Sequence, residues 1–290
     1  MKLMAFDIGG TSVKTGLFVD KELAEKSSFN TPNSFDKLIL EMKKYIKPDI
    51  DGVAISAPGV VDIQNRVIRN ESAVPYIHNR PIFDELETAL ERPVMIENDA
   101  NCAGICEITF GAGKNFNNIA FIVIGTGVGG SVFINKKIYK GAHLSGGEFG
   151  FMKDKDGRTL SNSATLVKGV AAYNKHVSEK KIKNGQELFT LAKDGDRLAQ
   201  DIIDNIYNRI AEGLYNLQVA FDFDAFIFGG GISARADLSK EIRKRLAKLL
   251  ADNVTDNIMP VVKSCKFHND ANLYGAVVSF LQNKDYVKVI

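Results

Sequence analysis

The chain has 290 residues, of which 45% are hydrophobic, and its 37 basic and 35 acidic residues give a net charge of +2. This length is enough for two domains of about 100–150 residues, each with its own core. The balanced charge gives no general attraction to nucleic acid or to an anionic membrane, and no apolar run reaches the ~20 residues of a membrane span, so small-molecule chemistry in the cytoplasm is expected.

The first 110 residues alternate between strand-like and helix-like patterns. The spacing of apolar residues predicts a β-hairpin over 1–20, amphipathic helices over 35–46 and 82–90, and buried strands over 52–57 and 93–97. A further helix is expected from about residue 98 to 110. Strands that alternate with helices in this way indicate an α/β domain.

The rest of the chain repeats this plan. Strands are expected from about residue 119 to 151, followed by a polar stretch at 153–163 without a clear period. Helices are expected from residue 165 onward, over 196–221, 238–250 and 271–281, with a strand over 260–267. Two halves that each start with a hairpin predict two similar α/β domains around a cleft, 1–112 and 113–270, with the last helix, about 271–290, packing back on the first domain.

Three apolar strands run directly into glycines: at Gly9 and Gly10, over 125–130 and over 229–231. Such turns let backbone N–H groups approach a phosphate closely, so they predict a bound nucleotide. The 125–130 turn has the Gly-x-Gly-x-x-Gly spelling of a dinucleotide site, but 131–139 reads as strand, turn, strand and not as the helix that such a site needs. No Gly-x-x-x-x-Gly-Lys-Ser/Thr loop occurs, so a phosphate cradle within hairpins is expected.

Polar side chains accompany the first glycine turn. Thr11 and Lys14 place a hydroxyl and a cation beside its glycines. Asp7 ends the preceding strand, where its carboxylate is placed to orient Mg²⁺, through water, near the phosphates. A purely structural aspartate is the alternative at this position.

A polar cluster at 97–101 follows an apolar strand and opens a helix, a position that projects side chains into a cleft. A hydroxyl that attacks a phosphate needs a carboxylate to accept its proton and an adjacent amide to fix its neighbours. Asp99 and Asn98 are the candidates for these two roles. The alternative is helix capping, for which Asn and Asp are also favoured.

A second candidate carboxylate, Glu148, lies in the glycine-flanked turn at 146–150. Side chain and backbone are suited there to hold vicinal hydroxyl groups. The alternative is an exposed loop glutamate without a role in binding.

The cysteines Cys102, Cys106 and Cys265 are odd in number, and their spacing does not match a disulfide framework. Cys102 and Cys106 are four residues apart on a predicted helix, which would place two sulfurs on one face for a metal. Small buried hydrophobic residues are the favoured interpretation, because free cysteine is among the most buried residue types.

These motifs together resemble the ROK family of repressors, open-reading-frame proteins and sugar kinases. In chain order, the segments that carry the resemblance are Phe6-Asp7-Ile8-Gly9-Gly10-Thr11-Ser12-Val13-Lys14, Ala57-Pro58-Gly59-Val60-Val61-Asp62, Glu97-Asn98-Asp99-Ala100-Asn101, Ile124-Gly125-Thr126-Gly127-Val128-Gly129-Gly130, Tyr139-Lys140-Gly141-Ala142, Gly147-Glu148-Phe149-Gly150, Gly229-Gly230-Gly231-Ile232 and Leu273-Tyr274-Gly275-Ala276.

The resemblance implies an actin-like (ribonuclease H-like) two-domain fold, ATP and Mg²⁺ as cofactors, a homodimer, and phosphorylation of a hexose, usually at its 6-hydroxyl. It makes Asp99 the general base, and it makes Asn98, Glu148 and the backbone of Gly59 contacts of the sugar. The residues that it places at the ATP site are Gly9, Gly10, Thr11, Lys14, Gly125, Thr126, Gly127, Gly230 and Gly231, with Asp7 near the metal.

The chain departs from the family in one segment. Most members continue the Gly-Glu-x-Gly motif with a His and then a cysteine-rich knuckle that binds structural zinc, and the His and the last Glu of the knuckle also touch the sugar. Here Phe151 stands at the His position, and no cysteine or glutamate occurs between it and Val170. The zinc site of the family cannot be assembled from this segment, so we expect no zinc site.

The sequence therefore predicts an ATP-dependent sugar kinase without zinc, acting on glucose or a β-glucoside, with an N-acetylmannosamine kinase as the alternative activity. A repressor of the same family is not favoured, because it needs a helix-turn-helix segment before the first strand, which is expected to begin at Leu3. A sugar-sensing protein that has lost catalysis is a further alternative. The presence of both Asp7 and Asp99 argues against it.

Overall fold

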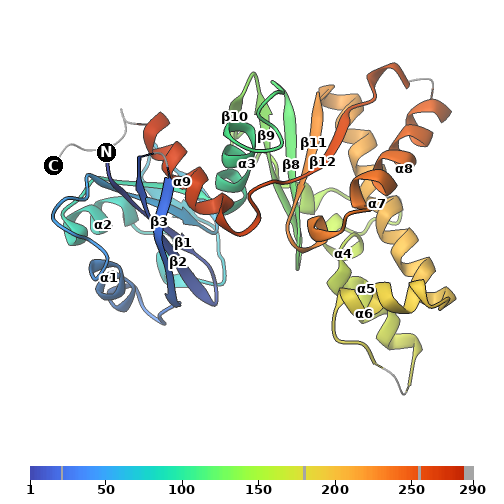
Figure 1. Ribbon diagram of the computed structural model, residues 1–290, viewed down its shortest axis with the longest axis horizontal. Coiled ribbons are helices and arrows are strands. Elements are labelled where there is room, and N and C mark those ends of the chain that lie inside the picture. The colour runs from blue at the N-terminus through green and yellow to red at the C-terminus, as the bar shows by residue number, and fades with distance from the viewer. Residues whose placement is uncertain (21, 179–180, 254–255, 284–290) are drawn as a thin grey trace. The chain divides into compact units, whose positions relative to one another are not determined.

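A computed structural model describes residues 1–20, 22–178, 181–253 and 256–283 of the chain. These residues form two compact units, the first made of 1–109, 141–145 and 269–283, and the second of 110–140 and 146–268 (Figure 1). Each unit is built on a five-stranded mixed sheet. When the strands of each sheet are numbered in chain order, both sheets have the order 3-2-1-4-5. The two domains expected at 1–112 and 113–270 stay a prediction.

The sheet of the first unit has the order β3-β2-β1-β4-β7. The strands are β1 (Leu3–Ile8), β2 (Ser12–Val19), β3 (Glu22–Asn30), β4 (Gly52–Ala57) and β7 (Val94–Asn98). β1 and β3 each run antiparallel to β2, which lies between them, whereas β4 and β7 run parallel to β1. Every residue of β1 and β4 is buried, as expected for central strands that are covered on both faces.

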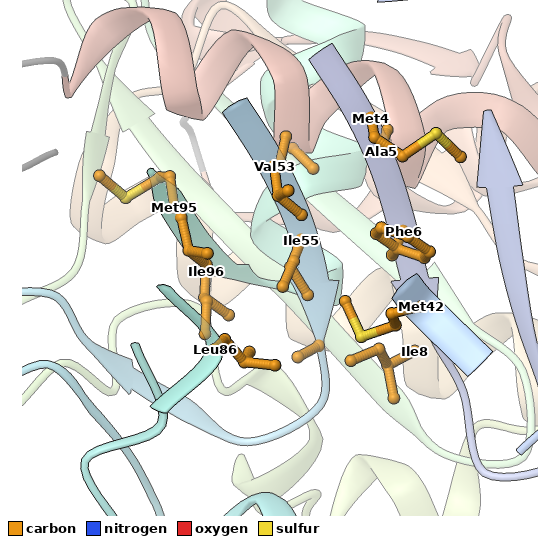
Figure 2. Packing of buried hydrophobic residues seen from close by; sticks show 14 of the residues in the cluster. Met4, Ala5, Phe6, Ile8, Met42, Val53, Ile55, Leu86, Met95 and Ile96 are labelled. Carbon is orange, nitrogen blue, oxygen red and sulfur yellow. The ribbon is translucent and has the colours of Figure 1, made fainter. Parts of the chain in front are cut away.

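Apolar side chains from three strands form the core on one face of this sheet. Figure 2 shows them packed with Met42 of α1 (Phe35–Lys43) and Leu86 of α2 (Ile82–Leu90). In β1 this face carries Met4, Phe6 and Ile8, and because side chains alternate along a strand, Asp7 belongs to the opposite face.

The opposite face is covered by α3 (Asp99–Thr109) and by α9 (Ala271–Gln282), which contacts β1, β4, β7 and α3. Figure 1 shows α9, in red, beside the first sheet although it comes last in the sequence. The helix expected to extend to 290 is described only to Gln282, and residues 284–290 lie outside the described part of the chain. A short hairpin of β5 (Val60–Asp62) and β6 (Val67–Arg69) follows β4.

The sheet of the second unit has the order β10-β9-β8-β11-β12, with the same strand directions as the first. Its strands are β8 (Ile119–Ile124), β9 (Val128–Ile134), β10 (Lys137–Tyr139), β11 (Ala225–Gly229) and β12 (Val261–Ser264). The expected similarity of the two halves is therefore visible in their strand order.

The helices of the second unit are α4 (Leu160–Ser163), α5 (Leu166–His176), α6 (Gly185–Lys193), α7 (Arg197–Phe221) and α8 (Leu238–Asp252). Thr165, Asn184 and Asp196 cap α5, α6 and α7, since each side chain accepts a hydrogen bond from a backbone N–H three residues later. In the described residues, no helix combines the length and the apolar character that crossing a membrane requires.

The observed elements differ from the expected ones in several places. The strands expected to extend to about residue 151 end at Tyr139, and Phe149–Phe151 is a 3₁₀ turn. β3 was not expected, because most of its residues are polar and exposed and so lack an apolar alternation. The strand expected over 260–267 is limited to β12. The polar stretch at 153–163 contains α4 and a bridge between Lys153 and Thr159, so it is more ordered than its sequence indicates.

The substitution Gly275→Ala tests the packing of α9 on α3. A Cβ atom at position 275 would stand 1.7 Å from the carbonyl oxygen of Cys102, which is backbone and moves only with α3. We expect the free energy of unfolding to fall by about 3 kcal/mol or more, although alanine is the better helix former. Urea unfolding measures the loss.

Gly213→Ala in α7 is the matched control. Its Cβ would meet only the two terminal methyl carbons of Leu160, Cδ1 at 3.0 Å and Cδ2 at 3.8 Å, and that side chain can shift. We expect a change within about 1 kcal/mol of zero, because the gain in helix propensity offsets a small packing cost. Equal losses in the two variants would contradict the packing argument.

Candidate active site

A row of polar side chains crosses the sheet of the first unit. The strand register pairs Lys14 of β2 with Asp7 of β1, Asp7 with Ser56 of β4, and Ser56 with Glu97 of β7. Residues paired in this way lie on the same face of a sheet. The row lies near the carboxyl ends of the parallel strands, where open α/β sheets bind ligands.

The Asp7 carboxylate is buried and has defined partners for each oxygen. Ser56 Oγ and Asn272 Nδ2, the latter from α9, donate hydrogen bonds to Oδ1 at 2.8 and 2.9 Å. Lys14 Nζ lies 3.8 Å from Oδ2. Two neutral donors therefore fix one oxygen, and the other oxygen faces a cation. Ser56 and Asn272 were not identified from the sequence.

The glycine turn after β1 is held by Thr31. The Gly9 N–H donates to Ser12 O at 3.0 Å, which closes the turn. Thr31 Oγ1 donates to Gly9 O at 2.6 Å, and Thr31 N donates to Thr11 O at 3.0 Å. A residue that follows β3 thus fixes the backbone beside Gly9, Gly10 and Thr11.

Asn98 and Asp99 lie at the junction of β7 and α3. Asn98 Oδ1 accepts from the Asn101 N–H at 3.0 Å, which is a helix cap, and Asn98 Nδ2 donates to Gly59 O at 3.0 Å. Asp99 Oδ1 accepts from the Ala100 N–H at 2.8 Å. The capping interpretation of Asn98 therefore holds, and the same side chain also ties the β7–α3 junction to the Gly59 turn.

The buried side chain of Glu97 also stabilises the junction of β7 and α3. Its side chain is buried, and Oε1 accepts from the Asn98 N–H at 2.8 Å and from Asn101 Nδ2 at 3.0 Å. Buried carboxylates are stable in a protein when they are satisfied by hydrogen bonds. Glu97 belongs to the polar cluster at 97–101, but this role was not identified from the sequence.

Cys102 lies fully buried beneath the same junction. Burial and the nearby carboxylates of Glu97, Asp7 and Asp99 raise the pKa of its thiol, so the neutral form is favoured. In the described ranges, no group of three or more His, Cys, Asp or Glu residues is arranged to hold a metal ion. Cys102 and Cys106 are core residues of the first unit.

Gly59 adopts a left-handed backbone conformation, with φ at +105°. A Cβ there would also stand 2.6 Å from Cε1 of His78, so only glycine fits. Burial lowers the pKa of His78, and its Nε2 lies 2.6 Å from Ser72 Oγ. His78 supports the Gly59 turn and was not identified from the sequence.

Asp62 anchors the hairpin that follows Gly59. Its carboxylate accepts from the Asn65 N–H and Asn65 Nδ2 at 3.0 and 2.8 Å, and from Arg69 Nη2 at 2.6 Å. Burial alone would raise the pKa of Asp62, but these hydrogen bonds and the Arg69 charge outweigh it and bring the pKa to about 2.

The glycine turns of the second unit lie against each other. Gly125 N donates to Gly127 O at 2.9 Å across the turn between β8 and β9. Gly230 has φ at +79°, and a Cβ there would stand 2.4 Å from Ile124 O, directly before Gly125. At Gly125 and Gly231, by contrast, an added Cβ would meet no described atom within 4 Å. This open backbone can be approached closely by a ligand.

The second unit contains a short 3₁₀ turn, Phe149–Phe151. Glu148 directly precedes this turn, and Phe151 is its last residue. Glu148 is exposed as a residue, yet partial burial of its carboxylate raises its pKa. Phe151 is 75% exposed, which is unusual for a phenylalanine.

A cavity of about 620 Å³ lies among α6, α7 and α8, next to the turn that follows β11. The guanidinium of Arg235 stacks on the ring of Phe189 at 3.6 Å, and Arg235 Nη2 donates to Asp237 Oδ2 at 2.6 Å. The cavity was not predicted, because its walls come from three separate segments.

A sequence model described as the ROK family matches residues 3–283. The chain belongs to the ROK family. It is 31% identical over 297 residues to a protein named beta-glucoside kinase from Listeria innocua, in an alignment that covers 98% of this chain and 99% of that protein. The family expected from the motifs is therefore confirmed.

Two solved structures extend the likeness to three dimensions. A ROK family protein from Streptococcus pneumoniae in complex with sucrose superposes with a TM-score of 0.90 at 33% identity, covering 98% of this chain and 99% of that one. A ROK family glucokinase from Streptomyces griseus in complex with glucose and AMPPNP superposes with a TM-score of 0.78 at 25% identity, covering 98% and 100%. The actin-like ATPase fold expected from the sequence is confirmed.

Asp62 gives the stability of the protein a pH dependence. Its folded-state pKa of about 2 is below the ordinary value of about 3.9, so its stabilising contribution is present above about pH 4 and is lost as the pH falls towards 2. We expect Asp62→Asn to be less stable at pH 7 and to show a shallower decline between pH 4 and 2. Urea unfolding at a series of pH values measures both; the wild-type slope in the variant would contradict the assignment.

Proposed function

We propose that the chain is a sugar kinase that transfers the γ-phosphoryl group of ATP to the 6-hydroxyl of glucose or of a β-glucoside. The names of its relatives support phosphoryl transfer to a sugar. The observation that carries the proposal is the β7–α3 junction, where Asp99 stands beside an Asn98 side chain that is hydrogen-bonded to the Gly59 backbone.

On the acceptor side, Asp99 is the proposed general base. One of its oxygens accepts the Ala100 N–H at the start of α3, and a helix N-terminus favours the ionised carboxylate. The base takes the proton of the attacking hydroxyl as the new O–P bond forms and the bond between the γ-phosphorus and the ADP oxygen breaks, so that ADP is the leaving group. Asn98 and the Gly59 backbone, which are already joined, are proposed to orient the neighbouring hydroxyls.

On the donor side, the turns at 125–127 and 230–231 are proposed to bind the phosphates. The open backbone at Gly125 and Gly231 fits this role, because a phosphate needs N–H groups that no side chain obstructs. In the first unit, Gly9, Gly10, Thr11 and Lys14 are also proposed to bind the phosphates. Lys14 would do so through the charge of its side chain.

Asp7 fits the role proposed for it near Mg²⁺. Its Oδ1 accepts from Ser56 and Asn272, so Oδ2, which lies 3.8 Å from Lys14 Nζ, is the oxygen that would hold a water of bound Mg²⁺. When bound, Mg²⁺ neutralises charge on the phosphate oxygens. Ser56 and Asn272 keep the Asp7 carboxylate in one orientation for this purpose.

The cavity among α6, α7 and α8, whose walls include Arg235 and Asp237, is proposed to take the nucleobase. Stacked Arg235 and Phe189 offer a planar cation and an aromatic ring, and both side chains are suited to pack on a purine. Asp237 holds the guanidinium in place.

The proposed tolerance of β-glucosides beside glucose depends on Phe151. This exposed aromatic side chain stands where most of the family carries a His that touches the sugar, so polar recognition of the anomeric end should be weak. An apolar wall discriminates between substrates only about 10–200-fold, so a substituent at the anomeric carbon should be tolerated. Glu148 is proposed to hold other sugar hydroxyls.

N-acetylmannosamine kinase is the alternative activity, and a non-catalytic sugar-sensing ROK protein is the alternative class. A coupled assay of ATP consumption with a panel of sugars separates the three. The homodimer, the cytoplasmic location and the use of Mg²⁺ stay predictions.

Asp99→Asn tests the general base. The amide keeps the size and some hydrogen bonding of the side chain but cannot accept the proton, so kcat should fall by about 10²–10⁴ while sugar affinity changes much less. Steady-state kinetics and calorimetric titration with the sugar measure the two quantities.

The matched control for this variant is Asp36→Asn. Asp36 also lies in the first turn of a helix, α1, but is exposed and belongs to no proposed site. Its kcat should equal that of the wild type. Near-normal turnover in Asp99→Asn would rule out Asp99 as the base.

Substrate comparison tests whether a β-substituent at the anomeric carbon is tolerated. We expect kcat/KM for glucose, methyl β-glucoside and cellobiose to differ by no more than about 200-fold, and N-acetylmannosamine to be poorer. A loss above about 10³-fold on adding the β-substituent to glucose would show a closed anomeric end.

Phe151→His then tests whether Phe151 is responsible for the tolerance of a β-substituent. The new polar contact should favour free glucose, so the ratio of kcat/KM for glucose over methyl β-glucoside should rise about 10-fold or more. Phe221→His changes another exposed phenylalanine, at the end of α7, and should leave the ratio unchanged. A shift of the same size in both variants would remove Phe151 from the specificity argument.

A further inference from the structure

Ser161 joins the 148–163 segment to the strand that leaves the 125–127 turn. Its Oγ accepts a hydrogen bond from the Val128 N–H at 3.0 Å and lies 3.3 Å from Val128 O, to which it can donate. Val128 is the first residue of β9 and follows Gly127 directly. One hydroxyl therefore serves both backbone groups of the residue that ends the turn.

In the described part of the sheet, no strand lies beside Val128 on the side where Ser161 contacts it. β10 pairs with β9 only at 132–134, so it ends before it reaches Val128. Ser161 therefore stands where a neighbouring strand would satisfy the backbone of Val128. A buried backbone group without such a partner is destabilising, so the hydroxyl matters for the geometry of the turn.

Gly150 makes a second contact of the same segment with Val128. A Cβ at Gly150 would stand 2.1 Å from Val128 O and 2.4 Å from Ser161 Oγ. The backbone of the segment therefore packs directly on the end of the turn. Because Glu148 is two residues before Gly150, one continuous segment reaches from the proposed sugar carboxylate to the proposed phosphate turn.

The middle of the segment is folded around the side chain of Asp154, which is only 1% exposed. Asp154 Oδ1 accepts from the N–H groups of Asp156 and Arg158 at 2.9 and 3.0 Å. The backbone closes on itself as well, since Asp154 N donates to Arg158 O at 2.8 Å and Gly157 N donates to Asp154 O at 2.9 Å. A carboxylate thus occupies the centre of the loop.

Arg209 of α7 fastens this loop to the long helix. Its side chain is 9% exposed; Nη1 lies 3.5 Å from Asp154 Oδ2, and Nη2 is hydrogen-bonded to Asp156. Burial by itself would raise the pKa of Asp154, but hydrogen bonds from Ser163 and from the loop backbone, together with the Arg209 charge, lower it. The pair is therefore ionised at neutral pH, and removing one member leaves the other charge buried.

We propose that Ser161 is a positioning residue for the 125–127 turn, and that the buried Asp154–Arg209 pair holds Ser161 against Val128. The inference rests on the proposed function, because the ligand of the turn is taken to be a nucleoside triphosphate. A turn with glycine at 125 and 127 has almost no side chain to fix its own backbone. Its N–H groups bind phosphate well only if another element holds them in position before the ligand arrives.

Ser161→Ala removes the hydroxyl and keeps the rest of the segment. We expect its affinity for AMPPNP, measured by calorimetry without sugar, to fall about 10-fold or more. Hydrogen exchange should become faster at Val128, and the melting temperature should fall by only a few degrees, because two unsatisfied backbone groups are a small part of the stability of a chain of this size. Ser161→Thr restores a hydroxyl and should return the affinity to within about 3-fold of the wild type.

Asn162→Ala is the matched control. Asn162 is the next residue of α4, is exposed, and donates only to Thr159 within the segment. Its affinity for AMPPNP should equal that of the wild type. Equal affinities in Ser161→Ala and wild type, or an equal loss in Asn162→Ala, would overturn the role of Ser161.

A double-mutant cycle tests the ion pair. Asp154→Asn should weaken AMPPNP binding, and adding Ser161→Ala to it should cause little further loss, since the hydroxyl is then already displaced. Losses that multiply would overturn the link between the pair and Ser161. Circular dichroism and the melting temperature of Asp154→Asn show that the variant is folded, and Arg209→Met offers a second way to break the pair if it is not.

AMPPNP binding and sugar phosphorylation by the wild type distinguish failure of this inference from failure of the proposed function. AMPPNP binding by the wild type with unchanged binding by Ser161→Ala removes the inference alone. A wild type that binds no AMPPNP and phosphorylates no sugar in the panel overturns the proposed function, and the role of Ser161 with it.

Discussion

The first unit is organised around one buried carboxylate in an otherwise apolar strand. Moving Asp7 out of water is costly unless hydrogen bonds replace the lost hydration, and here they come from β4 and from α9. α9 therefore has to return from the end of the chain to the first sheet. That return requires close packing on α3, which Gly275 permits because its backbone lies against the Cys102 carbonyl. The polar site and the core packing of this unit thus depend on each other.

The two sheets share a strand order but differ in what stands at equivalent positions. Asp7 is the second-to-last residue of β1, and Lys14 and Ser56 are its partners. The second-to-last residue of β8 is Val123, and its partners are Gly129 and Gly229. One half therefore presents charged and hydroxyl side chains, whereas the other presents bare backbone. Side chains suit proton and metal chemistry, and bare backbone suits phosphates, so the two halves of a repeated fold fit the two kinds of site that we propose.

The fold and the motif-bearing turns were predictable from the sequence because they depend on neighbouring residues. Apolar runs that end in glycine, and polar residues at the start of a helix, are local signals. The partners of the site were not predictable in this way. Asn272 is 265 residues from Asp7, and only the position of α9 brings them together. The walls of the cavity at Arg235 and Phe189 likewise come from helices that are separate in the sequence.

The 153–163 segment shows the same limit for a different reason. It has no hydrophobic period because its order does not come from an apolar face; it comes from one carboxylate that collects backbone N–H groups and an arginine. Such a loop looks unstructured in a sequence, since neither Asp154 nor Arg209 is unusual alone. A charged pair in a buried place stabilises only one arrangement well, because any other leaves a charge without its partner. That selectivity is what a segment needs if it is to hold Ser161 against Val128 and keep a glycine-rich turn in a single shape.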